Sequence, residues 1–115
     1  MIARVWHGWA PPEGADAYQE HFRTAMLPNL ERVPGFRGAQ LWRREREGQV
    51  EFVAVTTFDS IDAVRRFAGA DHERAVVEPE ARRALARFDE RCAHYEVAVG
   101  SQPHHGGPDA LPAAL

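Results

Sequence analysis

The chain has 115 residues, of which 44% are hydrophobic and 27% charged, and its formal net charge is −3 at pH 7. These values are typical of one soluble globular domain. A small net charge of mixed sign argues against a nucleic-acid partner. No apolar run approaches the roughly 20 residues of a membrane span. The N-terminus lacks the basic start and apolar core of a signal peptide, so we expect a cytoplasmic protein.

Missing residue types exclude several kinds of catalysis. All 14 basic residues are arginine, so a Schiff-base lysine, a pyridoxal-phosphate anchor and a phosphate-binding loop are absent. The two serines, Ser60 and Ser101, lie outside any G-x-S-x-G motif. Cys92 is the only cysteine, which excludes an internal disulfide and a thiolate metal cluster. Histidine, tyrosine and carboxylates remain for proton chemistry.

The N-terminal third predicts a strand followed by a helix. Residues 2–9 are rich in residues that favour strands, and "APPEG" ends this segment. Apolar residues then recur every three or four positions, which predicts a helix over residues 16–32. We expect Pro28 to kink this helix, because proline lacks a backbone donor and clashes with the preceding turn. The recurring residues are Tyr18, Phe22, Met26, Leu30 and Val33.

The remaining segments predict a hairpin, two helices and a strand. Residues 36–44 and 50–58 form strands joined by the polar "EREGQ". A helix over residues 61–68 follows, capped by Asp59 or Ser60. Another helix begins at Glu78-Pro79 and runs to residue 88. Residues 93–99 form the last strand, and residues 100–115 lack any period, so we expect a disordered and dispensable tail.

This order, β-α-β-β-α-β, predicts an α+β domain over residues 1–99 with the ferredoxin-like fold: a four-stranded antiparallel sheet with helices on one face. The segment "VEFVAVTTF" has apolar residues on both sides of its pleat, so both faces of the sheet should be buried. One domain has helices for one face only. A second subunit covering the other face makes a homodimer the structural expectation.

The segments "MIARVWHG", "FDS" before a helix, "FAGADHERAVVEPEA" and "HYEV" resemble the antibiotic biosynthesis monooxygenase family of dimeric α+β barrels. The resemblance spans residues 1–99. It implies a pocket and an oxygenase activity, since the superfamily includes cofactor-independent oxygenases of aromatic polyketides, quinol oxygenases and haem-degrading oxygenases. The haem-degrading type uses an asparagine on its first strand, and here the only asparagine is Asn29, in the first predicted helix.

Two histidines are the candidate catalytic residues. The first and last strands of this fold are antiparallel neighbours, and pairing Trp6 with Tyr95 would set His7 opposite His94. Residues of one parity share a face of the sheet, so both imidazoles and Glu96 would form a proton relay with a neutral histidine as general base. The alternatives are structural hydrogen bonds only, or iron ligation. Because the usual ligand spacing is missing, we expect no metal.

The candidate substrate-binding residues are aromatic or lie near the predicted loop between helices. The alternative for the tryptophans is ordinary core packing, and the alternative for the loop histidine is a solvated side chain. These candidates are Trp6, Trp42, Tyr95, Phe67 and His72.

The sequence therefore predicts a cofactor-independent homodimeric monooxygenase that oxidises an electron-rich aromatic, such as a phenol, hydroquinone or polyketide-like molecule, with O2. The pocket would exclude water, and it would supply a histidine base and hydrogen-bond donors for the developing oxyanion. The alternatives are a non-catalytic binding or sensing dimer, and a haem-binding or haem-degrading protein of the same fold.

Overall fold

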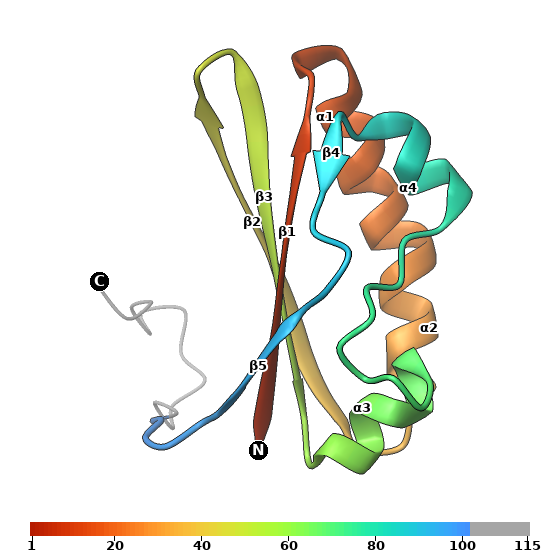
Figure 1. Cartoon of the computed structure of the whole chain (residues 1–115), viewed down its shortest axis with the longest axis vertical. Coiled ribbons are helices and arrows are strands. Elements are labelled where there is room, and N and C mark those ends of the chain that lie inside the picture. Colours follow the sequence, from red (N-terminus) through yellow and green to blue (C-terminus); the bar gives the residue numbers. More distant parts are fainter. Residues whose placement is uncertain (102–115) are drawn as a thin grey trace, which may run out of the picture.

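One antiparallel sheet carries the helices on a single face (Figure 1). The computed structural model describes residues 1–101. Neighbouring strands follow the order β2-β3-β1-β4, and β5 also pairs with β1. In chain order the elements are β1 (Ile2–Ala10), α1 (Pro12–His21), η1 (Phe22–Met26), α2 (Leu27–Glu31), β2 (Phe36–Arg46), β3 (Gln49–Phe58), α3 (Ile61–Ala68), α4 (Pro79–Ala84), β4 (Arg87–Phe88) and β5 (Ala93–Glu96).

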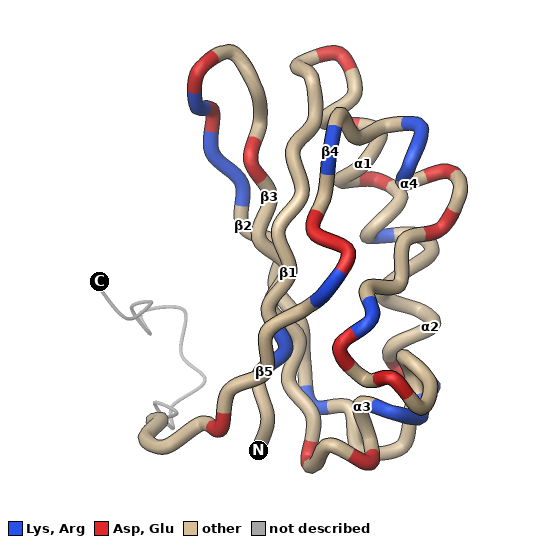
Figure 2. Tube along the Cα trace, in the orientation of Figure 1, with Lys and Arg blue, Asp and Glu red and all other residues tan. Residues whose placement is uncertain are grey.

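Strict alternation along β1 and β3 separates the two faces of the sheet. Even-numbered residues such as Trp6, Phe52 and Ala54 are buried beneath the helices, and their odd-numbered neighbours lie on the open face. This is the period of two that a half-covered strand requires. Residues 5–10 and 52–58 contain no Asp, Glu or Arg, so these stretches of the two central strands are uncharged (Figure 2).

The expected hairpin and the helix after it are confirmed. The turn between β2 and β3 places Glu47 and Gly48 at φ +54° and +78°. Two successive positive φ angles are typical of the type I′ turn, whose twist matches that of the flanking strands. The helix α3 has the expected bounds. Its N-cap is Ser60, whose Oγ accepts a hydrogen bond from the Ala63 N–H at 3.2 Å.

The expected first helix is longer than predicted and contains a π-helical turn. It begins at Pro12 and continues to Glu31 through α1, η1 and α2. The Leu27 N–H donates to the Phe22 carbonyl, five residues earlier, immediately before Pro28. Because proline has no N–H, the widened turn accommodates it within a continuous helical segment.

The expected helix from Glu78 to residue 88 is wrong at its end. The helix α4 stops at Ala84, and the chain turns extended at Leu85. The Ala86 N–H then donates to the Trp9 carbonyl at 2.7 Å, and β4 pairs with β1. The segment after Ala84 therefore pairs with the edge of β1 instead of forming the last turn of the expected helix. Instead of one last strand over residues 93–99, two short strands, β4 and β5, share the edge of β1.

Two buried clusters form the core between the sheet and the helices. The larger one surrounds Trp6, Tyr18 and Phe52, and the smaller one surrounds Leu30 and Phe58. Within residues 1–101, no helix is long and apolar enough to cross a membrane. The expected tail lies, from residue 102 onward, outside the described residues.

Candidate functional site

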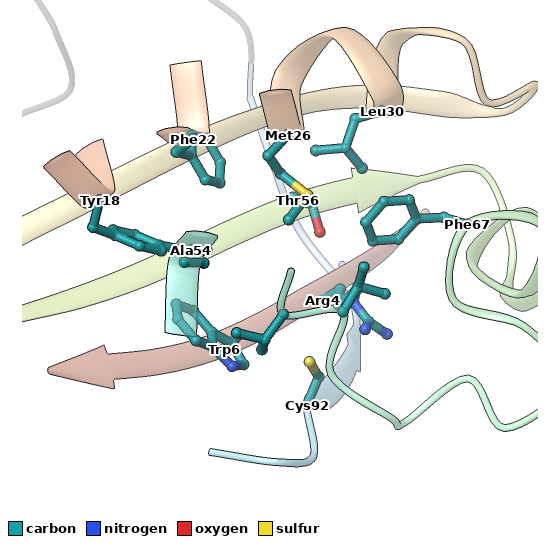
Figure 3. A pocket seen from close by; sticks show the side chains of 13 residues that line it. Arg4, Trp6, Tyr18, Phe22, Met26, Leu30, Ala54, Thr56, Phe67 and Cys92 are labelled. Carbon is teal, nitrogen blue, oxygen red and sulfur yellow. The ribbon is translucent and has the colours of Figure 1, made fainter. Parts of the chain in front are cut away.

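A narrow pocket lies between the inner face of the sheet and the helices (Figure 3). Its cavity volume is about 40 Å³. The walls are aliphatic and aromatic, with a few polar groups at one end. The lining residues are Arg4, Trp6, Tyr18, Phe22, Met26, Leu30, Ala54, Thr56, Phe67, Val76, Val77, Ala81 and Cys92.

Trp6 is the most firmly positioned aromatic residue of this pocket. Its ring stacks on that of Tyr18, with the centroids 5.8 Å apart. Its Nε1 donates a hydrogen bond to the Asp89 carbonyl at 2.8 Å. A Cβ at Gly8 would lie 2.4 Å from the edge of the Trp6 ring, so only glycine leaves room for the indole here. These contacts fix the indole as a rigid wall.

Arg4 is a buried cation at the polar end of the pocket, only 4% exposed. Its Nη1 donates to the His72 carbonyl and lies 3.1 Å from His94 Nε2, and its Nη2 donates to the Arg74 carbonyl at 2.8 Å. Among residues 1–101, no carboxylate lies within ion-pair distance of the guanidinium. Burial lowers the pKa of Arg4 from its ordinary value. The arginine is therefore held by neutral acceptors alone.

The contact with Arg4 sets the protonation of His94. A guanidinium only donates hydrogen bonds, so His94 Nε2 must accept and the ring proton of the neutral form lies on Nδ1. Burial, then Arg4 and His72, lowers the pKa of His94 from 6.5 to about 4. The His72 ring packs edge-on against it, with the centroids 5.0 Å apart. His94 is therefore a neutral and weakly basic imidazole at pH 7.

The pKa of His94 predicts a loss of stability in acid. Between pH 6.5 and about 4 the unfolded chain binds a proton at His94 that the folded chain does not, so stability falls as the pH falls. Solvent screening of this partly buried ring limits the loss to about 1 kcal/mol. His94→Gln keeps an acceptor for Arg4 but does not titrate. Urea unfolding at about pH 7 and about pH 4.5 should show the wild type losing about 1 kcal/mol more than this variant. Equal losses in the two proteins would contradict the assignment.

The other ionisable groups of the wall stay neutral. Burial raises the pKa of the Tyr18 phenol well above its ordinary value. Burial also raises the pKa of the Cys92 thiol, and the neighbouring Arg4 opposes this only in part. A phenol and a thiol that keep their protons are not bases, and the thiol is not a nucleophile at pH 7.

The expected relay of His7 and His94 is wrong. The strand β5 pairs Tyr95 with Ala3 and His94 with Arg4, three positions away from the expected register. An odd shift moves every side chain to the opposite face. His94 therefore lies on the inner face beside Arg4, whereas His7 lies on the open face, with its Nδ1 3.7 Å from an Asp89 carboxylate oxygen.

The structure brings together only part of the expected substrate-binding set. Trp6 and Phe67 line the pocket. His72 does not line it and contacts it only through His94 and the carbonyl bound to Arg4. Trp42 and Tyr95 are 52% and 59% exposed, and their strand positions place them on the open face.

Sequence reasoning missed several lining residues, above all Arg4. A single arginine in a strand is typical of a solvated edge, and nothing local marks it as buried. The available signal was parity, because Arg4 shares a face with Trp6 and Gly8 once β1 is recognised as a half-covered strand. Tyr18 and Phe22 were recognised as apolar positions of a helix, without a role in a pocket.

Neither a metal nor haem fits these residues well. Within residues 1–101, no group of three or more His, Cys, Asp or Glu side chains is placed to hold a metal ion. Histidine, a common axial ligand of haem iron, is absent from the lining residues. The nearest imidazole, His94, directs its Nε2 at Arg4. The pocket lining therefore offers no free imidazole to a haem iron.

An antiparallel sheet with helices on one face and an aromatic pocket between the layers defines an α+β protein of the ferredoxin-like class. The family model described as antibiotic biosynthesis monooxygenase matches residues 1–79, and the chain belongs to this family. No curated protein matches the chain significantly.

Solved structures of low sequence identity share this fold. A putative antibiotic biosynthesis monooxygenase from Bacillus cereus is 15% identical, with a TM-score of 0.65 over 91% of this chain and 98% of that one. SnoaB, a cofactor-independent oxygenase from Streptomyces nogalater, is 20% identical, with a TM-score of 0.58 over 90% and 98%. The heme-degrader MhuD from Mycobacterium tuberculosis is 22% identical, with a TM-score of 0.57 over 89% and 100%.

Proposed function

We propose that this protein is a cofactor-independent monooxygenase that oxidises an electron-rich aromatic molecule, such as a phenol, hydroquinone or polyketide-like compound, with O2. The observation that carries this proposal is a buried guanidinium, that of Arg4, at the end of an otherwise aromatic and aliphatic pocket. Aromatic walls suit a planar ring, and a fixed cation stabilises the negative charge that such a ring develops on oxidation. Membership of the monooxygenase family supports the same reaction class.

The proposed reaction needs no external reductant. A phenol that loses its proton donates electrons to O2, and a bond forms between oxygen and the carbon para to the phenolate. That carbon then loses its hydrogen as the O–O bond breaks. One oxygen atom stays as the new carbonyl of a quinone, and the other leaves as water, so that phenol and O2 give quinone and H2O. The protein contributes a dry pocket and a fixed positive charge.

The small cavity requires a movement on binding. About 40 Å³ holds roughly three water molecules and no aromatic ring. The segment between α3 and α4 supplies Val76 and Val77 to the wall, and Arg4 holds this segment through the His72 and Arg74 carbonyls. A displacement of this segment is the simplest way to admit a ring, because it lies between α3 and α4, outside any helix, whereas most of the remaining walls belong to the sheet or to helices.

Oxygen uptake with a panel of phenols and hydroquinones tests the proposed function. For a phenol with hydrogen on its para carbon we expect one O2 consumed per substrate, and with labelled O2 one labelled atom in the quinone and one in water. Phe67→Ala, which removes a pocket wall, should lower kcat/KM by about 10-fold or more. Phe36→Ala is the matched control, because Phe36 contacts the same Phe58 ring without lining the pocket. We expect it to change kcat/KM much less.

Other results would contradict an oxygenase. Saturable binding of phenols without oxygen uptake would identify a non-catalytic binding or sensing protein. A stoichiometric Soret shift with added haem, with no phenol oxidation, would identify a haem protein in spite of the poor fit of the lining residues.

We also propose that the protein is a homodimer through the open face of the sheet. Val5, Val53 and Val55 form the half-buried centre of this face, flanked by the exposed Trp42 and Tyr95. A contiguous apolar surface of this kind is typical of an interface. A second copy of the chain presents the same surface, so a twofold contact would cover both.

A further inference from the structure

We propose that the pocket selects its aromatic substrate in the ionised form, with the phenolate or enolate oxygen bound by Arg4, and that no side chain of the pocket serves as the base. This inference rests on the proposed function and specifies its substrate class: aromatic molecules acidic enough to reach the pocket as anions. It replaces the histidine base that the sequence suggested.

The pocket carries a positive charge without a negative partner among residues 1–101. Buried arginines are normally paired with a carboxylate, because taking an ion out of water costs far more than neutral hydrogen bonds return. Arg4 is 4% exposed, and its hydrogen-bond acceptors among residues 1–101 are two carbonyls, one imidazole and the Cys92 sulfur, none of which is a carboxylate. A ligand oxygen with a negative charge supplies the missing partner. A neutral ligand does not.

The Arg4 guanidinium also keeps hydrogen-bond donors for a ligand. A guanidinium has five N–H groups, and the contacts with His72, Arg74 and His94 use three. Two N–H groups are left, and the only further side-chain partner within reach of the guanidinium among residues 1–101 is the Cys92 sulfur, a weak acceptor. The Phe67 ring lies 5.8 Å from the guanidinium carbon. A phenolate held by the free donors would therefore place its ring among the aromatic walls.

No side chain that lines the pocket among residues 1–101 is placed to accept the substrate proton. Tyr18 and Cys92 keep their protons because burial raises their pKa values. His94 faces Arg4 through the nitrogen that would have to accept, and its pKa is lowered to about 4. His72 packs against His94 and does not line the pocket. The substrate proton must therefore leave to water before or during entry, and a buried cation favours the species that has already lost it.

Equilibrium binding to the wild-type protein without oxygen tests this inference. The probes are 4-nitrophenol, whose ionisation is visible in its absorbance, and 4-nitroanisole, which has the same ring and no acidic proton. The pH range should span the ionisation of the phenol, where His94 stays neutral and Tyr18 and Cys92 keep their protons. We expect the anion to bind about 10- to 100-fold more tightly than the ether, and the pKa of the bound phenol to fall by about one unit or more. Equal affinities, or a raised pKa of the bound phenol, would overturn the proposal.

Two variants test whether the preference for the anion depends on Arg4. Arg4→Gln keeps a hydrogen-bond donor but removes the charge, and should reduce the preference for the anion to about threefold or less. Arg37→Gln is the matched control, since Arg37 is a surface arginine paired with Asp59, and it should retain the full preference. Circular dichroism reports whether Arg4→Gln folds. If Arg4→Gln does not fold, the test rests on the wild-type protein: the relative affinities of 4-nitrophenol and 4-nitroanisole, and the pKa of the bound phenol.

Failure of this inference differs from failure of the proposed function. Tight binding of nitrophenolate with no oxygen uptake for any phenol would support the anion site and overturn the oxygenase. Oxygen uptake with a kcat/KM that stays constant across the ionisation of the substrate would support the oxygenase and overturn the anion site. If both hold, kcat/KM should rise with the ionised fraction of each phenol.

Discussion

Replacement of Phe52 by alanine should lower the free energy of unfolding by about 3–5 kcal/mol. Phe52 lies in the middle of β3, is 0% exposed and packs against the Tyr18 ring at a centroid distance of 4.8 Å. The truncation removes a full aromatic side chain and leaves a cavity that the sheet and the long helix close only in part. Urea unfolding followed by circular dichroism measures the loss.

Phe52→Leu is the matched control for this prediction. Leucine keeps most of the apolar volume, so the loss should stay below about 2 kcal/mol. A loss of less than about 1 kcal/mol for Phe52→Ala would contradict the central place that the core gives to this ring. Because domains of this size are stable by only about 5–15 kcal/mol, the alanine variant should be measured well below its melting temperature.

Replacement of Val55 by arginine should convert the proposed dimer into a monomer. Val55 lies on the open face, opposite Val5 on β1 and Gln40 on β2. A guanidinium at the centre of an apolar interface would have to be buried without a partner, which costs several kcal/mol. Light scattering at low micromolar concentration should report about half of the wild-type mass.

Ala17→Arg is the control, because Ala17 is exposed on α1, on the opposite side of the molecule from the open face. It adds the same charge and should leave the mass unchanged. A monomeric wild type at the same concentration would overturn the dimer itself. A dimeric Val55→Arg protein would place the interface elsewhere.

The layers of the fold followed from local patterns. Alternation in "VEFVAVTTF" identified a strand with two apolar faces, and a serine before an apolar stripe identified α3 with its cap. These features depend on neighbours in sequence, so a pattern is enough. The end of α4 was missed because the Ala86 N–H bonds to Trp9, a residue far away in the chain. The apolar spacing that suggested a helix continued beyond the point where the edge of β1 became available.

Only part of the candidate site could be predicted from the sequence, because the site too depends on contacts between residues far apart in the chain. Trp6 and Phe67 were recognised because large aromatic residues tend to line pockets. The histidine relay failed because the register of β5 is set by contacts across the sheet, among them Arg4 with His94. No periodicity along one strand encodes which residue of another strand lies opposite. Because the expected register was wrong by three residues, His94 was proposed as a base beside His7. In the structure it is a neutral hydrogen-bond partner of Arg4.

The π-helical turn has a consequence for the shape of the pocket. In an α-helix, residues four apart drift by roughly 40°, so the three steps from Tyr18 to Leu30 would rotate the side chains by roughly 120°. The turn over Phe22–Met26 takes up one extra residue, which offsets roughly 100° of that rotation. Tyr18, Phe22, Met26 and Leu30 therefore all line the cavity from one side of the long helix. A chain shortened by one residue in this turn would wind as a regular α-helix and still hold Leu30 within roughly 20° of the direction of Tyr18, so the wall would keep its order, whereas an α-helix of the present length would turn Leu30 away from it.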